Sequence, residues 1–249
     1  MVKRITILLC MCALGMQGIV GAKLSDSFSF LQKDPLYAQF VYVVRTEGST
    51  QKAEQIRLLL VAQQEQGYEH AIREIRANTT LARLYVEEGS GDGQRARALL
   101  EEAEQRLKPL AEQRLFSLIL GSEIDGVWYL MNPKSLGKGI SSSRQINKAY
   151  KEFPQEVSSQ MLKANSLLYA PALAGGDTKK ALNMFLGLLK DAEPILSSWD
   201  RASLYSGIGI ACYKLKDYEN AKGYLASAKA IYPFDAVLDE YIALVGAAL

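Results

Sequence analysis

Apolar residues recur every three or four positions along nearly the whole chain. Ala53, Ile56, Leu59 and Leu60 fall on one face of a predicted helix, and residues 94–108 repeat the same spacing. No stretch shows the sustained alternation of apolar and polar residues that is typical of a half-buried strand. Glycines and prolines interrupt the helical pattern at short intervals and divide it into roughly ten or eleven helices joined by short turns. The pattern therefore predicts an all-α fold.

Small residues repeat over a longer distance than one helix. The positions Ala96, Ser142, Ala181 and Ala221 follow one another at intervals of 46, 39 and 40 residues. Such a period is typical of stacked pairs of helices, in which each pair buries its apolar face against the next. We expect the two helices of the last pair to approach closely at Gly209 and Ala228, where larger side chains would push them apart.

The last helix pair resembles the tetratricopeptide repeat (TPR). The residues in register with that family are Tyr205, Ile208, Gly209, Ala221, Leu225, Ala228 and Pro233. The resemblance is strongest at about 158–192 and 202–233 and weakens before residue 120. It implies TPR-like helix-turn-helix repeats stacked into a right-handed superhelix over residues 23–249. Residues 234–249 are predicted to form a C-terminal capping helix whose Val237, Tyr241 and Leu244 cover the last repeat.

In the TPR family, the first helix of each pair lines a concave surface that receives peptides or helices of partner proteins. Carried onto this chain, the resemblance implies a partner-binding groove made of Asn165, Tyr169, Ser206, Ile210, Tyr213 and Lys214. The alternative interpretation is that the two tyrosines only pack between neighbouring repeats.

The N-terminus has the order of regions found in secretory signal peptides. Two positive charges in the first four residues precede a mostly apolar stretch over residues 5–20, and small residues end at Ala22. We expect cleavage after Ala22, so that residues 1–22 are a signal peptide and the protein is exported, to the periplasm or the cell envelope. The alternatives are a retained membrane anchor and lipid attachment at Cys10 or Cys12. The apolar stretch is shorter than the ~20 residues needed to span a bilayer.

The composition changes once the signal peptide is set aside. The whole chain has 249 residues, 49% of them hydrophobic, and 29 Lys and Arg against 27 Asp and Glu. Removing residues 1–22 deletes two basic residues and no acid, which leaves 27 of each sign. This balance argues against a nucleic-acid partner, which requires clustered cations. One cysteine, Cys212, stays in the mature chain, so no intramolecular disulfide is expected and the fold depends on its apolar core.

None of the motifs that suggest chemistry is complete. Residues 207–212 lack the third glycine of a dinucleotide loop, and residues 137–143 lack the Gly-Lys-Ser/Thr of a phosphate loop and are interpreted as a flexible link between helices. The glycine-rich turn at 88–93 lacks the acidic twelfth ligand of a calcium loop. His70 has no second histidine near it and is interpreted as a packing or solvent-facing residue, and Cys212 as a core residue. We therefore expect no catalytic residues, no metal and no cofactor.

Charged residues on two further segments are interpreted structurally. Asp177 is predicted to cap the N-terminus of the helix that follows it. The acidic and basic residues of the 94–108 helix are expected to form a solvated face through pairs along the helix: Arg95, Arg97, Glu101, Glu102, Glu104 and Arg106.

The sequence thus predicts a non-enzymatic, exported interaction scaffold whose partners are envelope or periplasmic proteins, with no stable membrane span after signal cleavage. A second resemblance gives the alternative. Residues 170–181 are similar to a segment of the TPR-like T-component of TRAP transporters. This resemblance implies an accessory subunit that associates with a periplasmic solute-binding protein.

Overall fold

A computed structural model describes residues 23–63, 67–87 and 93–249. The predicted signal peptide and the turn at 88–92 lie outside these residues. The described part of the chain forms eleven α-helices and has no strand, which confirms the all-α prediction. The helices are α1 (Pro35–Tyr42), α2 (Thr50–Ala62), α3 (Tyr68–Glu87), α4 (Gly93–Leu107), α5 (Arg114–Met131), α6 (Leu136–Glu152), α7 (Val157–Tyr169), α8 (Thr178–Ala192), α9 (Ser198–Lys214), α10 (Tyr218–Ile231) and α11 (Ala236–Ala248). Short helical segments of other types precede α1 or lie between the α-helices: the 3-10 helices η1 (Ser29–Lys33), η3 (Lys108–Leu110), η4 (Ala172–Ala174) and η5 (Glu193–Ile195), and the π-helix η2 (Val43–Glu47).

Many of the helices are preceded by a residue whose side chain accepts a hydrogen bond from a backbone N–H of the first turn. This contact satisfies a backbone N–H that has no partner within the helix. Asp177 does so for α8 by accepting from the Lys180 N–H at 2.9 Å, which confirms its predicted role. The other capping residues of this kind are Asp34, Ser49, Ser197, Asp217 and Asp235.

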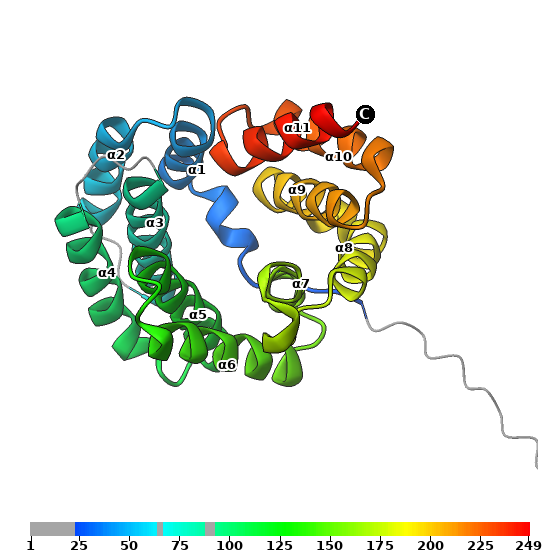
Figure 1. Cartoon of the computed structure of the whole chain (residues 1–249). Helices are drawn as coiled ribbons and strands as arrows, with labels where there is room; N and C mark the ends of the chain where they lie inside the picture. The colour runs from blue at the N-terminus through cyan, green and yellow to red at the C-terminus, as the bar shows by residue number, and fades with distance from the viewer. Residues whose placement is uncertain (1–22, 64–66, 88–92) are drawn as a thin grey trace, which may run out of the picture.

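Consecutive helices form pairs, each with one helix on the inside of the molecule and one on the outside. Figure 1 shows α3, α5, α7 and α9 around the centre and α4, α6, α8 and α10 outside them. The repeated positions Ala96, Ser142, Ala181 and Ala221 lie in the four outer helices, and all four are buried. Gly209 of α9 confirms the predicted close approach, because a Cβ built there would lie 2.7 Å from Leu225 Cγ of α10.

The row of pairs curves until its two ends meet. The Arg45 side chain of η2 forms an ion pair with Asp235 at 3.1 Å and lies over the rings of Trp199 and Tyr232. Its carbonyl oxygen accepts a hydrogen bond from the Phe234 N–H at 3.0 Å. These contacts join the first helices to α9, α10 and α11, so the helices are arranged in a closed ring (Figure 1), and the space inside it is described below.

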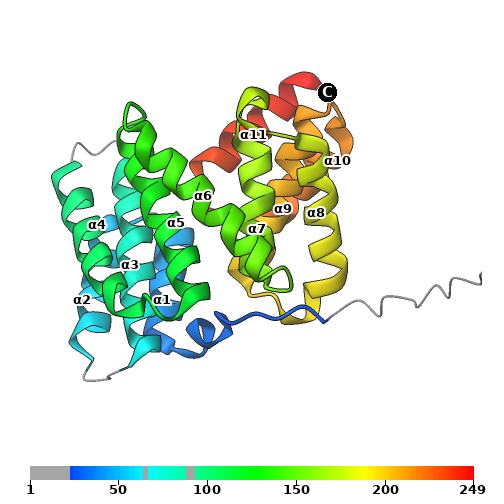
Figure 2. The ribbon, with the colours of Figure 1, turned by 90° about the horizontal axis from the view of Figure 1, so that it is seen from below.

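The N-terminal segment closes one end of this space. Figure 2 shows residues 24–33 running across the lower edge of the molecule from α7 toward α1. The Ser25 N–H donates to Gln155 O at 3.0 Å, and the Ser25 and Ser27 hydroxyls donate to the buried Glu156 carboxylate at 2.8 and 3.0 Å. The core consists of two hydrophobic clusters, one over α1–α6 and one over α7–α11, and this segment contacts both.

Two sequence-based predictions require correction here. Residues 137–143 are not a flexible link, because they lie inside α6, where Gly139 packs against the Tyr129 ring. The predicted capping helix is present as α11, and Val237 and Tyr241 pack against the second cluster as predicted, but its fully buried residues are Leu238 and Val245, and Leu244 is exposed. Tyr241 packs edge-on against Tyr213 of α9, with 5.5 Å between ring centroids.

Candidate binding site

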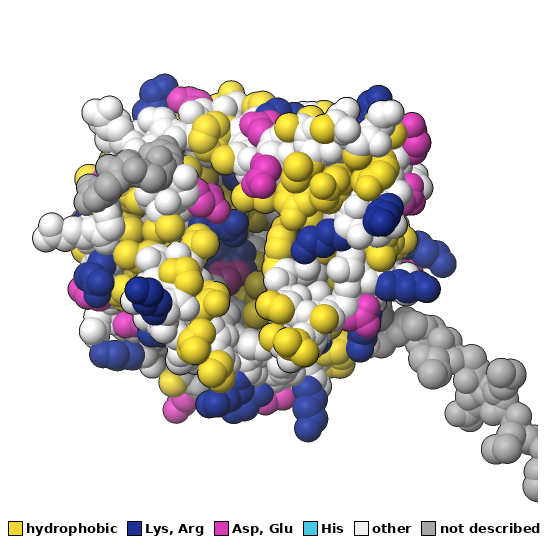
Figure 3. All heavy atoms as spheres, viewed as in Figure 1, with side chains coloured by type: hydrophobic (Ala, Val, Ile, Leu, Met, Phe, Trp, Pro, Cys, Tyr) yellow, Lys and Arg dark blue, Asp and Glu magenta, His cyan; other side chains and the backbone are white. Residues whose placement is uncertain are grey.

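The space between the inner helices is a hollow that opens on one face of the molecule. Figure 3 shows it from its open end, with Lys, Arg and acidic side chains inside and hydrophobic side chains around the opening. Figures 1 and 2 together show that the α5–α6, α7–α8 and α9–α10 turns lie at this open end, and the N-terminal segment at the opposite end. We call the open end, with these turns, the mouth face.

Charged groups from four elements meet near the closed end of the hollow. Arg76 of α3 forms an ion pair with Glu123 of α5 at 2.9 Å, and its guanidinium lies 4.2 Å from the centroid of the Phe28 ring. Asp26 and Asp200 add two carboxylates that interact with Arg76. Burial, followed by repulsion from Asp200, raises the pKa of Asp26 to about 6. Burial also raises the pKa of Glu123, while Arg76 opposes this effect.

A second set of groups lies nearer the mouth. Arg83 of α3 pairs with Glu87 at 2.6 Å and is within electrostatic reach of Asp235 and Tyr169. Water reaches 53% of Tyr169, yet the surrounding protein raises its pKa to about 12. A side chain that is both exposed and surrounded by protein is expected inside a concave surface. The hollow is therefore polar and lined from both halves of the chain.

Two of the predicted groove residues come together at the mouth. Lys214 of α9 donates a hydrogen bond to Leu168 O at 2.7 Å, and its Nζ lies 5.3 Å from the centroid of the Tyr169 ring of α7. The lysine thus satisfies a free carbonyl at the end of α7, where a positive charge is also favoured by the helix dipole. The same contact leaves about half of the tyrosine open to solvent.

The other predicted groove residues are less accessible. Ile210 is 0% exposed and lies in the core of the second cluster, so its inclusion in a binding groove is wrong. Ile210 directly follows Gly209, where α9 approaches α10 most closely. Tyr213 packs against Tyr218 and Tyr241. Asn165 and Ser206 are partly buried.

Exposed apolar side chains on the turns of the mouth face were not predicted from the sequence. Leu173 is fully exposed at the tip of the α7–α8 turn. That turn is held by backbone hydrogen bonds from Gly175 to Ala172 O at 3.0 Å and from Asp177 to Leu167 O at 2.9 Å. Further large apolar side chains exposed at the α5–α6 and α9–α10 turns are Tyr129, Leu130, Leu136, Ile140 and Leu215. The sequence signal for their exposure is that several are leucines next to glycine, proline or lysine at predicted turns.

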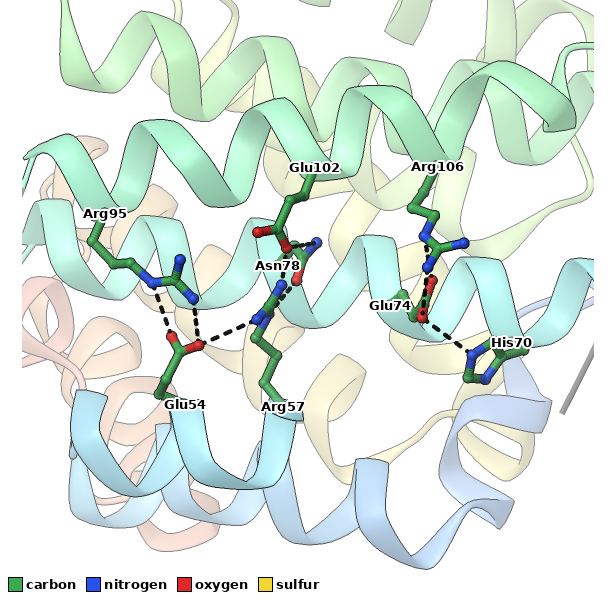
Figure 4. A network of polar contacts seen from close by, with 8 residues as sticks. All are labelled: Glu54, Arg57, His70, Glu74, Asn78, Arg95, Glu102 and Arg106. Atoms are coloured by element: carbon green, nitrogen blue, oxygen red, sulfur yellow. Dashed lines mark hydrogen bonds and ion pairs between the residues drawn. The ribbon is translucent and has the colours of Figure 1, made fainter. Parts of the chain in front are cut away.

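The outer side of the first cluster carries a separate network of ion pairs between α2, α3 and α4 (Figure 4). Arg57 is 4% exposed, donates to Asn78 Oδ1 at 2.6 Å and also binds Glu54 and Glu102. The remaining contacts of the network include pairs of Arg95 with Glu54, of Arg106 with Glu74 at 2.8 Å, and of His70 with Glu74 at 3.1 Å.

This network corrects the expectation for the charges of α4. Arg95, Glu102 and Arg106 pair with residues of α2 and α3, where we expected pairs along the helix itself. His70 is a packing residue, as predicted, since only 12% of its side chain is exposed. The groove beside the network, about 420 Å³ in volume, is lined largely by groups that already have partners, and we assign the network to holding three helices together.

A second groove lies between α4, α5 and α6, with a volume of about 400 Å³. The Trp128 indole N–H donates to Glu104 at 2.9 Å, and Lys138 donates to Glu104 and Asp125, each at 2.8 Å. Arg97 lies over the same indole ring. These contacts join the three helices beneath the α5–α6 turn and stabilise that part of the mouth face.

Cys212 is buried, as predicted, and burial raises the pKa of its thiol, which keeps it protonated. Within residues 23–63, 67–87 and 93–249, no three His, Cys, Asp or Glu side chains are grouped to hold a metal ion. In the same part of the chain, no helix combines the length and apolar content needed to cross a bilayer. No protein-family model, no curated protein and no solved structure matches the chain.

Proposed function

We propose that the protein is a non-enzymatic interaction scaffold that binds a partner protein on its mouth face. The observation that carries this proposal is the set of exposed leucines on ordered turns around a polar hollow. Leu173 is the strongest case, because its turn is fixed by backbone hydrogen bonds and the side chain is still fully exposed. An apolar group held in advance in its bound position loses little entropy on binding, which suits it to be an anchor.

The TPR-like superhelix is part of the same proposal. The pairing of inner and outer helices, the buried small residues at repeated positions in α4, α6, α8 and α10, and the close packing at Gly209 support it. Export to the periplasm or envelope, with removal of residues 1–22, completes the proposal and rests on the order of regions at the N-terminus. The partners proposed are accordingly envelope or periplasmic proteins.

The experiment compares two aspartate substitutions in capture from the envelope fraction. Leu173→Asp places a charge on the mouth face, and Leu186→Asp places one on α8, at a leucine that is also partly exposed. We expect Leu173→Asp to lower capture of the specific partner at least tenfold and Leu186→Asp to leave it unchanged. Equal capture by both variants would refute the assignment of the mouth face. Substitutions of Tyr213 or Lys214 would test the surface less cleanly, because both side chains also make contacts within the fold.

A specific observation also supports the alternative, an accessory subunit that partners a periplasmic solute-binding protein. Residues 170–181, which carry the resemblance to the T-component of TRAP transporters, include the turn that presents Leu173 and the start of α8. Binding of a solute-binding protein encoded beside this protein, abolished by Leu173→Asp, would favour this alternative. Binding that Leu173→Asp does not change would contradict it.

A further inference from the structure

The N-terminal segment, residues 24–33, connects the two halves of the ring at the closed end of the hollow (Figure 2). Leu24 packs against the cluster of α7–α11, whereas Phe28 and Leu31 are buried in the cluster of α1–α6. Apart from the short η1, the segment is not helical and lies outside the helix pairs. A segment held at a few points is the kind of element that opens locally while the rest of a fold stays intact.

On the α7 side, the segment is held by hydrogen bonds to the residues at the start of the helix. The Ser25 N–H donates to Gln155 O at 3.0 Å, and the Val157 N–H donates to Ser25 O at 2.9 Å. The Glu156 carboxylate accepts from the hydroxyls of Ser25 and Ser27. Because Glu156 is only 5% exposed, a second negative charge near it is poorly screened and opposes the attachment.

Asp26 lies between the two serines, where the segment crosses from one half of the ring to the other. Its carboxylate accepts a hydrogen bond from the Phe28 N–H at 3.0 Å. Asp200 of α9 and Glu156 repel the carboxylate, and Arg76 of α3 attracts it. These charged neighbours belong to both halves of the ring, so the charge of Asp26 acts on the contact between them.

Arg76 cannot neutralise all of these carboxylates, because it already has other partners. It forms an ion pair with Glu123 of α5 at 2.9 Å and also interacts with Asp200 and with Tyr37 of α1. One positive charge thus serves the carboxylates of Asp26, Glu123 and Asp200. Ionisation of Asp26 therefore adds a negative charge to a site that already has an excess of them.

We propose that the N-terminal segment is a pH-dependent latch on the closed end of the hollow. While Asp26 is protonated, the segment stays attached to both halves of the ring. Once Asp26 is ionised, repulsion from Asp200 and Glu156 favours release of the segment, and the hollow becomes accessible from both ends. The latch is a property of the chain alone and is independent of the partner proposed for the mouth face.

The size of the effect follows from the pKa of Asp26 in the two forms. This pKa is about 6 in the attached form, and we expect its ordinary value of 3.8 once the segment is released into water. The protonated side chain therefore stabilises the attached form at low pH, and this contribution is lost as pH rises through 6. Between pH 5 and pH 7.5, the equilibrium constant for release should increase by about tenfold.

Hydrogen exchange at residues 24–31 measures this release in the protein as purified from the cells that make it. Protection factors, which correct for the faster intrinsic exchange at higher pH, are compared at pH 5 and pH 7.5. We expect the protection of these residues to fall by about tenfold. Helix α9 should stay at least about tenfold better protected than the segment at both pH values, because the release is local.

Asp26→Asn tests the role of the carboxylate, and Asp217→Asn is the matched control. An asparagine at position 26 can still accept from the Phe28 N–H but cannot ionise. Asp217 is exposed and likewise accepts from a backbone N–H, at the start of α10. We expect the change in protection to disappear in Asp26→Asn and to persist in Asp217→Asn. Asp200→Asn, which removes a repelling charge, should make the change smaller.

The proposal is overturned by equal protection of residues 24–31 at pH 5 and pH 7.5, or by a change that persists in Asp26→Asn. Protection of the segment equal to that of α9 also overturns it, since the segment then detaches only when the whole chain unfolds. A change of full size in Asp200→Asn contradicts the repulsion between the two carboxylates. Loss of partner capture in Leu173→Asp alters none of these outcomes, so the latch and the mouth-face proposal fail separately.

Discussion

Gly48→Ala tests the contact that joins the two ends of the chain. Gly48 has a φ of 61°, in the left-handed region that glycine adopts at low cost. A Cβ built on it would lie 2.2 Å from Cζ of Phe234, the residue whose N–H donates to Arg45 O. The substitution therefore strains the backbone of η2 and displaces the Phe234 ring at the same time.

The two effects can be estimated separately. The left-handed backbone costs an alanine about 1 kcal/mol. Phe234 is 37% exposed, and moving its ring forfeits part of the apolar area that is buried, which at ~25 cal/mol per Å² amounts to a further 1–2 kcal/mol. We expect Gly48→Ala to lower the free energy of unfolding by about 2–3 kcal/mol in total. Hydrogen exchange should also become faster at residues 43–48 and 232–236.

Gly175→Ala is the matched control for this measurement. Gly175 has a φ of 87° and no atom within 4 Å of a built Cβ, so its substitution costs the backbone strain alone. Urea unfolding followed by circular dichroism gives both free energies. In a background of Phe234→Ala, the Gly48→Ala penalty should fall to about 1 kcal/mol, because the clash is gone. Equal penalties at positions 48 and 175 would refute the contact between the two ends.

Three further changes test other parts of the fold. Glu156→Gln should destabilise the N-terminal segment by about 1–2 kcal/mol, because the two serine hydroxyls donate to Oε2 and the Ser27 N–H donates to Oε1, whereas an amide has only one acceptor oxygen. Faster hydrogen exchange at residues 24–31 is the readout, and unchanged exchange contradicts it. Gly209→Ala should lower the free energy of unfolding in urea by about 1–3 kcal/mol, because the added methyl group displaces Leu225. An unchanged free energy would contradict the close approach of α9 and α10. The folded-state pKa of Asp26, about 6, exceeds its ordinary value of 3.8, so its stabilising contribution is present below pH 4 and is lost as pH rises through 6. Asp26→Asn should remove that part of the pH dependence, and an unaltered stability profile between pH 4 and 7 would contradict the assignment.

Local features of the fold could be predicted from the sequence because neighbouring residues determine them. The capping role of Asp177, the close packing at Gly209 and the buried position of Cys212 each follow from residue type and spacing within one helix pair. On α11, the spacing correctly places Val237 and Tyr241 against the last repeat, but it puts Leu244 there as well, which is exposed, and misses the buried Leu238 and Val245.

Features that depend on distant residues could not be predicted. Arg45 and Asp235 are separated by most of the chain, and no local pattern indicates that they meet. The same holds for Ser25 with Glu156. The groove prediction shows both outcomes: Tyr169 and Lys214 come together at the mouth, whereas Ile210 is buried. Which side of an inner helix faces the hollow depends on how its neighbours pack, and apolar residues on both sides made the choice ambiguous.

Site-specific photocrosslinking in the cells that make the protein tests the proposed binding surface most directly. A photoreactive amino acid replaces Leu173 on the mouth face in one strain and Leu186 on α8 in another, both at exposed leucines. The proposal predicts that position 173 crosslinks to one defined envelope protein and that position 186 does not. Crosslinking of that protein at position 186 but not at 173 would contradict it.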